Sequence, residues 1–156
     1  MVGALRTRRD IVGAAGPLAG GAGLALLAGA AQAQSAAASA GERANLKLVG
    51  DFCAAWPAHD LAKLMAFFSD NPTYRQTETQ PPAVGREAVS AKIDAFLKDV
   101  VRFDVHDSWA RGPMVINERS DFFTGRLKLW RGVGVFLIKD GKIVEWHDYT
   151  IEVQRA

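Results

Sequence analysis

The amino-acid sequence predicts an α+β domain in which three N-terminal helices pack into a curved antiparallel sheet. Two observations carry this prediction. Apolar residues recur at intervals of three and four as far as residue 99, as in amphipathic helices, and at every second position beyond it, as in strands. Turn signals then divide the second half of the chain into four segments. A sheet that wraps around helices in this way makes a cone, and we expect the cone to enclose a pocket.

Three helices are expected before residue 99. The first runs from Glu42 to Pro57. The second follows Asp60, a favourable N-cap residue, and is stopped by Asp70-Asn71-Pro72, while the third follows Gly85. Their apolar faces are formed by Leu46, Val49, Phe52, Cys53 and Trp56, by Leu61, Leu64, Met65, Phe67 and Phe68, and by Val89, Ile93, Phe96 and Leu97, respectively.

The strands are separated by residues that favour turns. Gly112-Pro113, Gly125 and Asp140-Gly141 stand between them, and the last of these pairs is typical of a tight hairpin. A short extended piece from Thr73 to Thr77, followed by a turn at Pro81-Pro82, joins the second helix to the third. The four strands are expected at residues 100–111, 113–124, 126–138 and 142–153.

The N-terminal segment has the three parts of an export signal. Arg6, Arg8 and Arg9 precede a mildly hydrophobic run, and the small-residue site Ala31-Gln32-Ala33 follows it. The paired arginines resemble a twin-arginine signal, for which an ordinary secretory signal or an uncleaved anchor is the alternative. We expect a periplasmic or secreted protein without a stable membrane anchor after cleavage. Its parts are a signal at residues 1–33, a flexible leader at 34–41 and one domain at 42–156.

Charge and composition exclude several classes of function. Residues 1–33 hold three arginines and one aspartate, so without them the formal charge falls from +2 to zero. A neutral domain without a Lys/Arg cluster is not expected to bind nucleic acid. The single cysteine, Cys53, lies in an apolar helical stretch and is expected to be a buried thiol. The scattered histidines, His59, His106 and His147, do not have the spacing of a metal site.

Two charged side chains on the second predicted strand are candidates for chemistry. Arg119 and Asp121 lie two positions apart, so both leave the same face of a strand. Asn117 and Phe123 share that face, and the bulky Phe123 indicates that the face points inward. A buried guanidinium and a buried carboxylate need mutual hydrogen bonds or a further partner, because isolated buried charges are costly.

The last predicted strand can supply that partner. Val144, Trp146 and Asp148 alternate, and the two apolar residues mark their face as inward. If the last two strands are neighbours, Asp148 can approach Arg119 from the side opposite Asp121, and one arginine can bind both carboxylates. Two aspartates with unequal surroundings can serve as acid and base. The alternative is an ion-pair cluster with a purely structural role.

The short extended piece contributes two more candidates. Tyr74 and Gln76 lie two apart and place a phenol and a primary amide on one face, where they can hold a water molecule. Ordinary strand surface is the alternative explanation for this pair.

Taken together, these residues resemble the limonene epoxide hydrolase family, from about Asn45 to Glu152. The family's active site combines a tyrosine and an amide two positions later, an Arg-x-Asp pair and a late Trp-x-Asp-Tyr segment, inside a cone of the nuclear transport factor type. The family usually has asparagine at the amide position. In this chain the corresponding residues are Tyr74 and Gln76, Arg119 and Asp121, and Trp146-His147-Asp148-Tyr149.

The resemblance implies one-step addition of water to an apolar epoxide, either terpene-like or of another cyclic type, with no cofactor or metal. Asp148 is then the general base, which deprotonates a water held by Tyr74 and Gln76. Asp121 is the general acid, and Arg119 bridges the two carboxylates. A homodimer is expected by analogy. Two alternatives stay open, namely a ketosteroid-isomerase-like or polyketide-cyclase-like enzyme and a non-catalytic domain that binds a small molecule.

Overall fold

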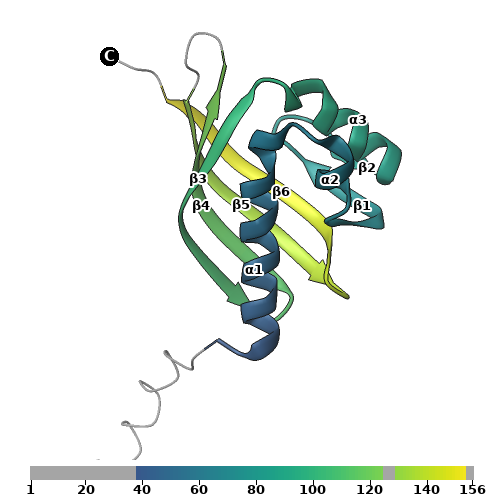
Figure 1. The fold of residues 1–156 in the computed structure, drawn as a ribbon, viewed down its shortest axis with the longest axis vertical. Coiled ribbons are helices and arrows are strands. Elements are labelled where there is room, and N and C mark those ends of the chain that lie inside the picture. The colour runs from purple at the N-terminus through teal and green to yellow at the C-terminus, as the bar shows by residue number, and fades with distance from the viewer. Residues whose placement is uncertain (1–37, 125–128, 154–156) are drawn as a thin grey trace, which may run out of the picture. The chain divides into compact units, whose positions relative to one another are not determined.

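The helices of this protein cover one face of a strongly curved sheet (Figure 1). The computed structural model describes residues 38–124 and 129–153, so the predicted export signal and the turn at Gly125 lie outside the described residues. Within them, the predicted α+β class is confirmed, and the four long strands follow the helices as predicted, although two further strands, Phe68–Arg75 and Ala83–Val84, precede the third helix. The elements are α1 (Ala40–Ala55), a 3₁₀ turn (Trp56–Ala58), α2 (Leu61–Met65), β1 (Phe68–Arg75), β2 (Ala83–Val84), α3 (Arg86–Leu97), β3 (Val100–Arg111), β4 (Met114–Phe123), β5 (Leu129–Lys139) and β6 (Lys142–Val153).

Helix α1 begins earlier than the sequence analysis predicted. Ser39 is its N-cap, and the Ser39 hydroxyl accepts from the backbone N–H of Glu42 while the Glu42 carboxylate accepts from the backbone N–H of Ser39. This reciprocal capping box satisfies two backbone donors at the start of the helix. The prediction of a flexible leader that extends to residue 41 was therefore wrong at its C-terminal end.

The second predicted helix is much shorter than expected. Asp60 caps α2 as predicted, accepting from the backbone N–H of Lys63 at 2.9 Å, but the helix ends at Met65. Phe68 already belongs to β1, where it pairs with Ile143 of β6. The apolar run at the end of the predicted helix is thus used by the sheet, because strand pairing over buried residues outweighs the local helical pattern.

The sheet has the order β2-β1-β6-β5-β4-β3. Strands β3 to β6 form the predicted antiparallel meander. The sheet as a whole is mixed, however, because β1, predicted only as a short extended piece, joins it parallel to β6. Positive backbone angles at Gly112, Asp140 and Gly141 confirm the turns predicted there.

The core lies between the inner face of the sheet and the helices. Phe52 of α1 is fully buried and packs edge-on against Trp146, with ring centroids 5.2 Å apart. Cys53 is buried as predicted, and burial raises the pKa of its thiol to about 11. A register shift between β5 and β6 makes Ile143, rather than the predicted Val144, the buried residue at the start of β6. None of the described helices combines the length and the hydropathy needed to cross a bilayer.

Candidate active site

The candidate residues lie on neighbouring strands around one cavity. Arg119 and Asp121 are on the inner face of β4 and Asp148 is on the inner face of β6, with β5 between these strands. Tyr74 is on β1, which flanks β6 on its other side, and Gln76 follows directly after that strand. The structure therefore brings all five of these residues to one region of the inner face.

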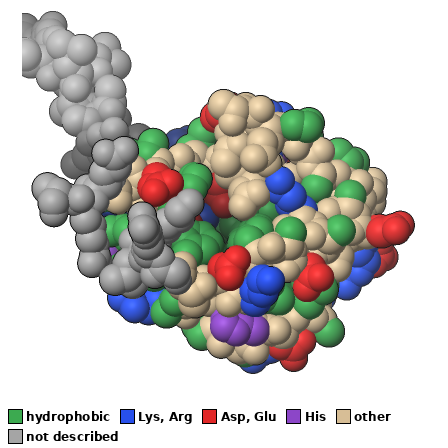
Figure 2. All heavy atoms as spheres, turned by 90° about the horizontal axis from the view of Figure 1, so that it is seen from above, with side chains coloured by type: hydrophobic (Ala, Val, Ile, Leu, Met, Phe, Trp, Pro, Cys, Tyr) green, Lys and Arg blue, Asp and Glu red, His purple; other side chains and the backbone are tan. Residues whose placement is uncertain are grey.

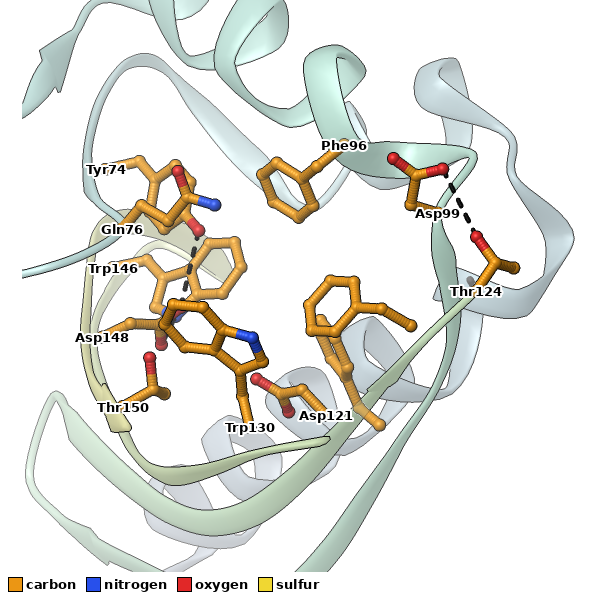
Figure 3. A pocket seen from close by; sticks show the side chains of 12 residues that line it. Tyr74, Gln76, Phe96, Asp99, Asp121, Thr124, Trp130, Trp146, Asp148 and Thr150 are labelled. Atoms are coloured by element: carbon orange, nitrogen blue, oxygen red, sulfur yellow. Dashed lines mark hydrogen bonds between the residues drawn. The ribbon is translucent and has the colours of Figure 1, made fainter. Parts of the chain in front are cut away.

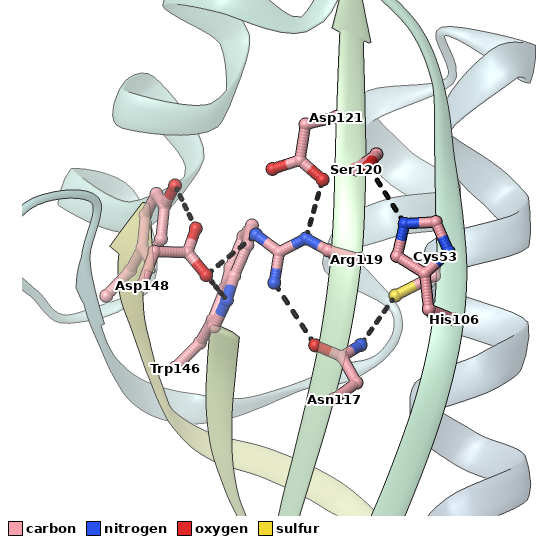
Figure 4. Close-up of polar contacts among 9 residues, drawn as sticks. Cys53, His106, Asn117, Arg119, Ser120, Asp121, Trp146 and Asp148 are labelled. Atoms are coloured by element: carbon pink, nitrogen blue, oxygen red, sulfur yellow. Dashed lines mark hydrogen bonds and ion pairs between the residues drawn. The ribbon is translucent and has the colours of Figure 1, made fainter. Parts of the chain in front are cut away.

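Arg119 bridges the two carboxylates (Figure 4). Its Nε donates to Oδ1 of Asp121 at 2.8 Å, and its Nη2 donates to Oδ1 of Asp148 at 2.7 Å. The guanidinium carbon lies 5.0 Å from the ring centroid of Phe103 and 5.7 Å from that of Trp146. Arg119 is only 1% exposed, and both aspartates are buried as well. The bridge is therefore largely sealed from solvent by aromatic rings.

A glycine on the intervening strand makes room for this bridge. Gly134 of β5 lies opposite Asn117 of β4 and opposite Asp148 of β6. A methyl group added at Gly134 would overlap the Nη1 atom of Arg119 and the side-chain oxygen of Asn117. The guanidinium can thus cross from β4 to β6 because β5 presents no side chain at this point.

Two polar groups, on Asn117 and Trp146, orient the members of the bridge. The amide oxygen of Asn117 accepts from Nη1 of Arg119 at 3.2 Å, and its amide nitrogen donates to Sγ of Cys53 at 3.4 Å. The indole N–H of Trp146 donates to Oδ1 of Asp148 at 2.7 Å. The sequence analysis placed Asn117 on the inner face and Trp146 in the active-site segment of the resembled family, without a hydrogen bond for either, and the network shows that each holds a charged partner.

The two carboxylates open onto a cavity of about 410 Å³. Figure 2 looks onto this end of the domain and shows a hollow with hydrophobic and acidic side chains in it. Six of the twelve lining residues are aromatic, and the other six are polar (Figure 3). The lining residues are Tyr74, Gln76, Phe96, Asp99, Phe103, Asp121, Phe123, Thr124, Trp130, Trp146, Asp148 and Thr150.

Tyr74 and Gln76 stand on the cavity wall next to Trp146 (Figure 3). The ring of Tyr74 stacks on that of Trp146, with centroids 4.0 Å apart. Its hydroxyl lies 3.5 Å from Oδ2 of Asp148, the oxygen that Arg119 leaves free. Burial and the neighbouring carboxylate raise the pKa of Tyr74 well above its usual value, so the phenol remains a hydrogen-bond donor.

Burial dominates the electrostatics of the three charged residues. It raises the pKa of Asp148 to about 6 even though Arg119 and Trp146 favour the ionised form. It raises the pKa of Asp121 as well, again against the attraction of Arg119. Burial lowers the pKa of Arg119, but the two carboxylates raise it by more, so the guanidinium keeps its charge. One cation faces two acids, so the group as a whole favours uptake of one proton.

The histidines lie apart from this cavity. Nε2 of His59 contacts the backbone oxygen of Val100 at 2.6 Å, and Nε2 of His106 contacts Oγ of Ser120 at 2.8 Å. His147 lies beside Glu145 on β6. Within residues 38–124 and 129–153, no three His, Cys, Asp or Glu side chains are grouped so that they could hold a metal ion.

The residues that the sequence analysis missed left weak signals in the sequence. Gly134 interrupts an alternating apolar strand, and such a glycine indicates close approach of another group. Asn117 belongs to the run Asn-x-Arg-x-Asp, in which every second residue is polar on a face that should be apolar. Trp130 appears only as one more aromatic residue in a strand, and its position in the cavity follows from the fold.

The two aspartates bridged by Arg119 can accept a proton from a ligand and donate a proton to it within the same cavity. A buried acid–base pair joined by an arginine can take a proton at one carboxyl and give one at the other. Fold and site together define a nuclear transport factor 2-like α+β cone whose aromatic pocket contains paired carboxylates. The sequence model of the SnoaL-like domain matches residues 49–146, and the chain belongs to this family.

Similar solved structures have the same fold. An LEH-like epoxide hydrolase from M. tuberculosis matches with a TM-score of 0.63 and 22% identity, over 70% of this chain and 84% of that one. The epoxide hydrolase/cyclase-like enzyme SalBIII matches with a TM-score of 0.66 and 17% identity, over 70% and 92%. A computationally designed 17-OHP binder matches with a TM-score of 0.64 and 15% identity, over 72% and 98%. At these identities the likeness establishes the fold.

Proposed function

We propose that this protein is an epoxide hydrolase of the limonene epoxide hydrolase type, which adds water to an apolar epoxide in one step. The observation that carries the proposal is the Arg119 bridge, which holds two buried carboxylates at the wall of an aromatic cavity. One bridged carboxylate can serve as base and the other as acid without a metal or a covalent intermediate. The proposal agrees with the fold shared with the LEH-like epoxide hydrolase and with the epoxide hydrolase/cyclase-like enzyme SalBIII.

In the proposed reaction one aspartate takes a proton from water, and the other gives a proton to the epoxide oxygen. Ionised Asp148 removes a proton from the attacking water, whose oxygen forms a bond to one epoxide carbon. The carbon–oxygen bond of that carbon breaks, and protonated Asp121 gives its proton to the departing oxygen. The product is a diol. The site is reset when a proton passes from Asp148 back to Asp121.

The hydrogen-bond donors around each carboxyl support this assignment of roles. Asp148 faces three donors, from Arg119, Trp146 and Tyr74, whereas Asp121 accepts from Arg119 alone among the described residues. Donors favour the ionised form, and deeper burial favours the protonated form. These effects oppose each other at Asp148, which is the more buried of the two aspartates. We infer that the hydrogen-bond donors outweigh burial at Asp148 and keep it ionised, so that Asp121 carries the shared proton.

The hydroxyl of Tyr74 and the amide of Gln76 complete the proposed water site. Both groups line the cavity, and the Tyr74 hydroxyl lies next to the free oxygen of Asp148. A misplaced water costs rate rather than binding, so Gln76→Leu should lower kcat by about tenfold to hundredfold and change KM little. Gln76→Asn, which restores the residue usual in the resembled family, should retain more activity than Gln76→Leu.

A single-turnover experiment in isotopically labelled water tests the mechanism. With enzyme in excess over a cyclic epoxide, the first diol molecules should carry the label. A covalent ester would instead deliver an unlabelled carboxylate oxygen in that first turnover. Absence of diol across a panel of cyclic and acyclic epoxides would contradict the proposed function.

Variants of Asp148 and Asp121 test their proposed roles as base and acid. Asp148→Asn and Asp121→Asn should each lower kcat by about 10²- to 10⁴-fold, the usual contribution of a general base or acid. Asp99→Asn is the matched control, because Asp99 is an exposed carboxylate that lines the same cavity. An Asp148→Asn variant that keeps wild-type turnover would refute the assignment of the base.

An isomerase-like or cyclase-like reaction is the second candidate. The pKa of about 6 at Asp148 suits a base that removes a proton next to a carbonyl group. In that case a ketone substrate should exchange deuterium with solvent and no diol should form. A third outcome, tight binding of a ligand without turnover, would indicate the non-catalytic role for which the designed binder of the same fold is a precedent.

We further propose that the exported protein is a homodimer that pairs through the outer face of its sheet. Tyr149 and Ile151 of β6 are 48% and 71% exposed on that face, and apolar side chains of this size favour a covered position. Light scattering after size exclusion measures the mass, and a monomer would contradict pairing. Cell fractionation tests the expected periplasmic or secreted location, which a cytoplasmic protein with intact residues 1–33 would contradict.

A further inference from the structure

The residues on the inner face of β5 differ greatly in size. Its successive inward positions are occupied by Trp130, Gly132, Gly134 and Phe136. Two large aromatic residues therefore flank two glycines, which let neighbouring groups approach closely: Arg119 at Gly134 and the backbone of β6 at Gly132. The glycines lie between the strand that carries Asp121 and the strand that carries Asp148.

Trp130 precedes these glycines on β5 and lies beside Asp121, the proposed acid. It lies directly opposite Asp121 in the register of β4 and β5. Side chains in such cross-strand positions are in reach of each other. Trp130 lines the same cavity as both aspartates, and Figure 3 shows its indole ring extending into the cavity near Asp121.

The indole N–H of Trp130 has no function in the network described so far. The hydrogen bonds among the described residues do not include one from this N–H, whereas the indole N–H of Trp146 is bound to Asp148. A half-buried donor in an aromatic cavity is available to an acceptor on a ligand. An epoxide whose oxygen lies beside Asp121 is in reach of this donor, because Trp130 lines the same cavity directly opposite Asp121.

We propose that Trp130 is a substrate-binding residue. Its N–H donates to the epoxide oxygen beside Asp121, and its ring narrows the cavity so that compact cyclic epoxides fit and longer ones do not. This inference rests on the proposed hydrolase function and extends it to the substrate class. As the carbon–oxygen bond breaks, negative charge develops on the oxygen, and the hydrogen bond from Trp130 strengthens.

The test separates the N–H from the ring. Trp130→Phe keeps an aromatic ring and removes the donor, so kcat for a compact cyclic epoxide should fall by about tenfold or more with little change in KM. Trp130→Ala should raise KM for that epoxide and allow turnover of an epoxide with a second ring. Trp109→Phe is the matched control, since Trp109 of β3 is 50% exposed and does not line the cavity.

The outcomes distinguish this inference from the proposed function. If the wild type makes diol and Trp130→Phe has the kinetics of Trp109→Phe, the role of the N–H is refuted while the hydrolase function stands. If the wild type makes no diol, the hydrolase function fails. Binding of a compact cyclic carboxamide, measured by calorimetry, then tests Trp130 separately. Weaker binding by Trp130→Phe than by Trp109→Phe supports the contact, and equal binding refutes it.

Discussion

Strand β4 takes part in two ion pairs of equal length on its two faces. On the inner face, Arg119 and Asp121 are 2.8 Å apart, with side chains 1% and 7% exposed. On the outer face, Glu118 and Arg131 are also 2.8 Å apart, with side chains 36% and 58% exposed for Glu118 and Arg131, respectively. The two pairs have the same chemistry and differ in their access to water. Burial rather than distance therefore decides what each pair can do.

The pKa values of the two carboxyls shift in opposite directions. The hydrogen bond from Arg131 lowers the pKa of Glu118, as is usual for an exposed pair. Asp121 has an equally close arginine, and burial nevertheless raises its pKa. A carboxyl with a raised pKa can hold a proton and give it up, so only the inner pair is suited to acid–base chemistry.

Removal of the buried cation should have the largest effect. Arg119→Met leaves two buried carboxylates without their partner, which should lower the free energy of unfolding by about 3–5 kcal/mol and abolish turnover. Urea denaturation of this variant and of Arg131→Met measures the contrast between the two faces. Equal stabilities for the two variants would mean that burial does not distinguish the pairs.

The pH dependence of stability should reveal the raised pKa of Asp148, the proposed base. The pKa of Asp148 in the folded protein, about 6, lies above the usual value of 3.8, so the folded state binds the extra proton more tightly. The free energy of unfolding should therefore rise as pH falls from about 7 to about 4, by up to about 3 kcal/mol from this group. The contribution is the difference between the wild type and Asp148→Asn in denaturant titrations. Identical pH profiles for the two proteins would exclude the raised pKa.

A single methyl group on β5 should disturb the bridge without changing any charge. Gly134→Ala forces Arg119 and Asn117 to move, which should cost about 1–3 kcal/mol of stability and lower kcat. Gly50→Ala is the control, because a methyl group in α1 at that position meets open space. It should be neutral or slightly stabilising, since alanine favours helices. Thermal unfolding measures the difference in stability between the two variants. A Gly134→Ala variant as stable and active as Gly50→Ala would show that the Arg119 bridge does not need a glycine at this position.

Loss of the exposed pair should have the smallest effect. Glu118→Gln keeps the size of the side chain and removes its charge, and water and salt already screen this pair. Neither the free energy of unfolding nor kcat should change measurably. A clear loss of stability would mean that the outer face of β4 is buried in the working protein, as the proposed dimer allows.

The meander and the positions of Arg119, Asp121 and Asp148 could be predicted because they follow local rules. Alternation places every second residue on one face, and hairpin turns make consecutive strands neighbours. Both rules act over short sequence distances. The approach of Asp148 to Arg119 across one intervening strand needed only these rules and a search for a partner for the buried charge.

The other features depend on pairings that local rules do not contain. Phe68 looks helical in its own neighbourhood and becomes a strand residue only because β6 is available beside it. The role of Gly134 depends on which side chain of β4 lies opposite. The position of Trp130 in the cavity depends on the register of the same two strands. Ser39 is an exception, since its capping box with Glu42 was readable from the sequence and was missed.

The place of β6 in the sheet has a consequence for how the protein is made. This strand is the last of the described elements and yet lies inside the sheet, between β1 and β5. Tyr74 and Asp148 are 74 positions apart and meet only across it. Contacts of such long range form slowly and need the whole chain. A nascent polypeptide that still lacks β6 therefore contains neither the finished cavity nor the bridged acids, and the paired-carboxylate site forms only once this strand has joined the sheet.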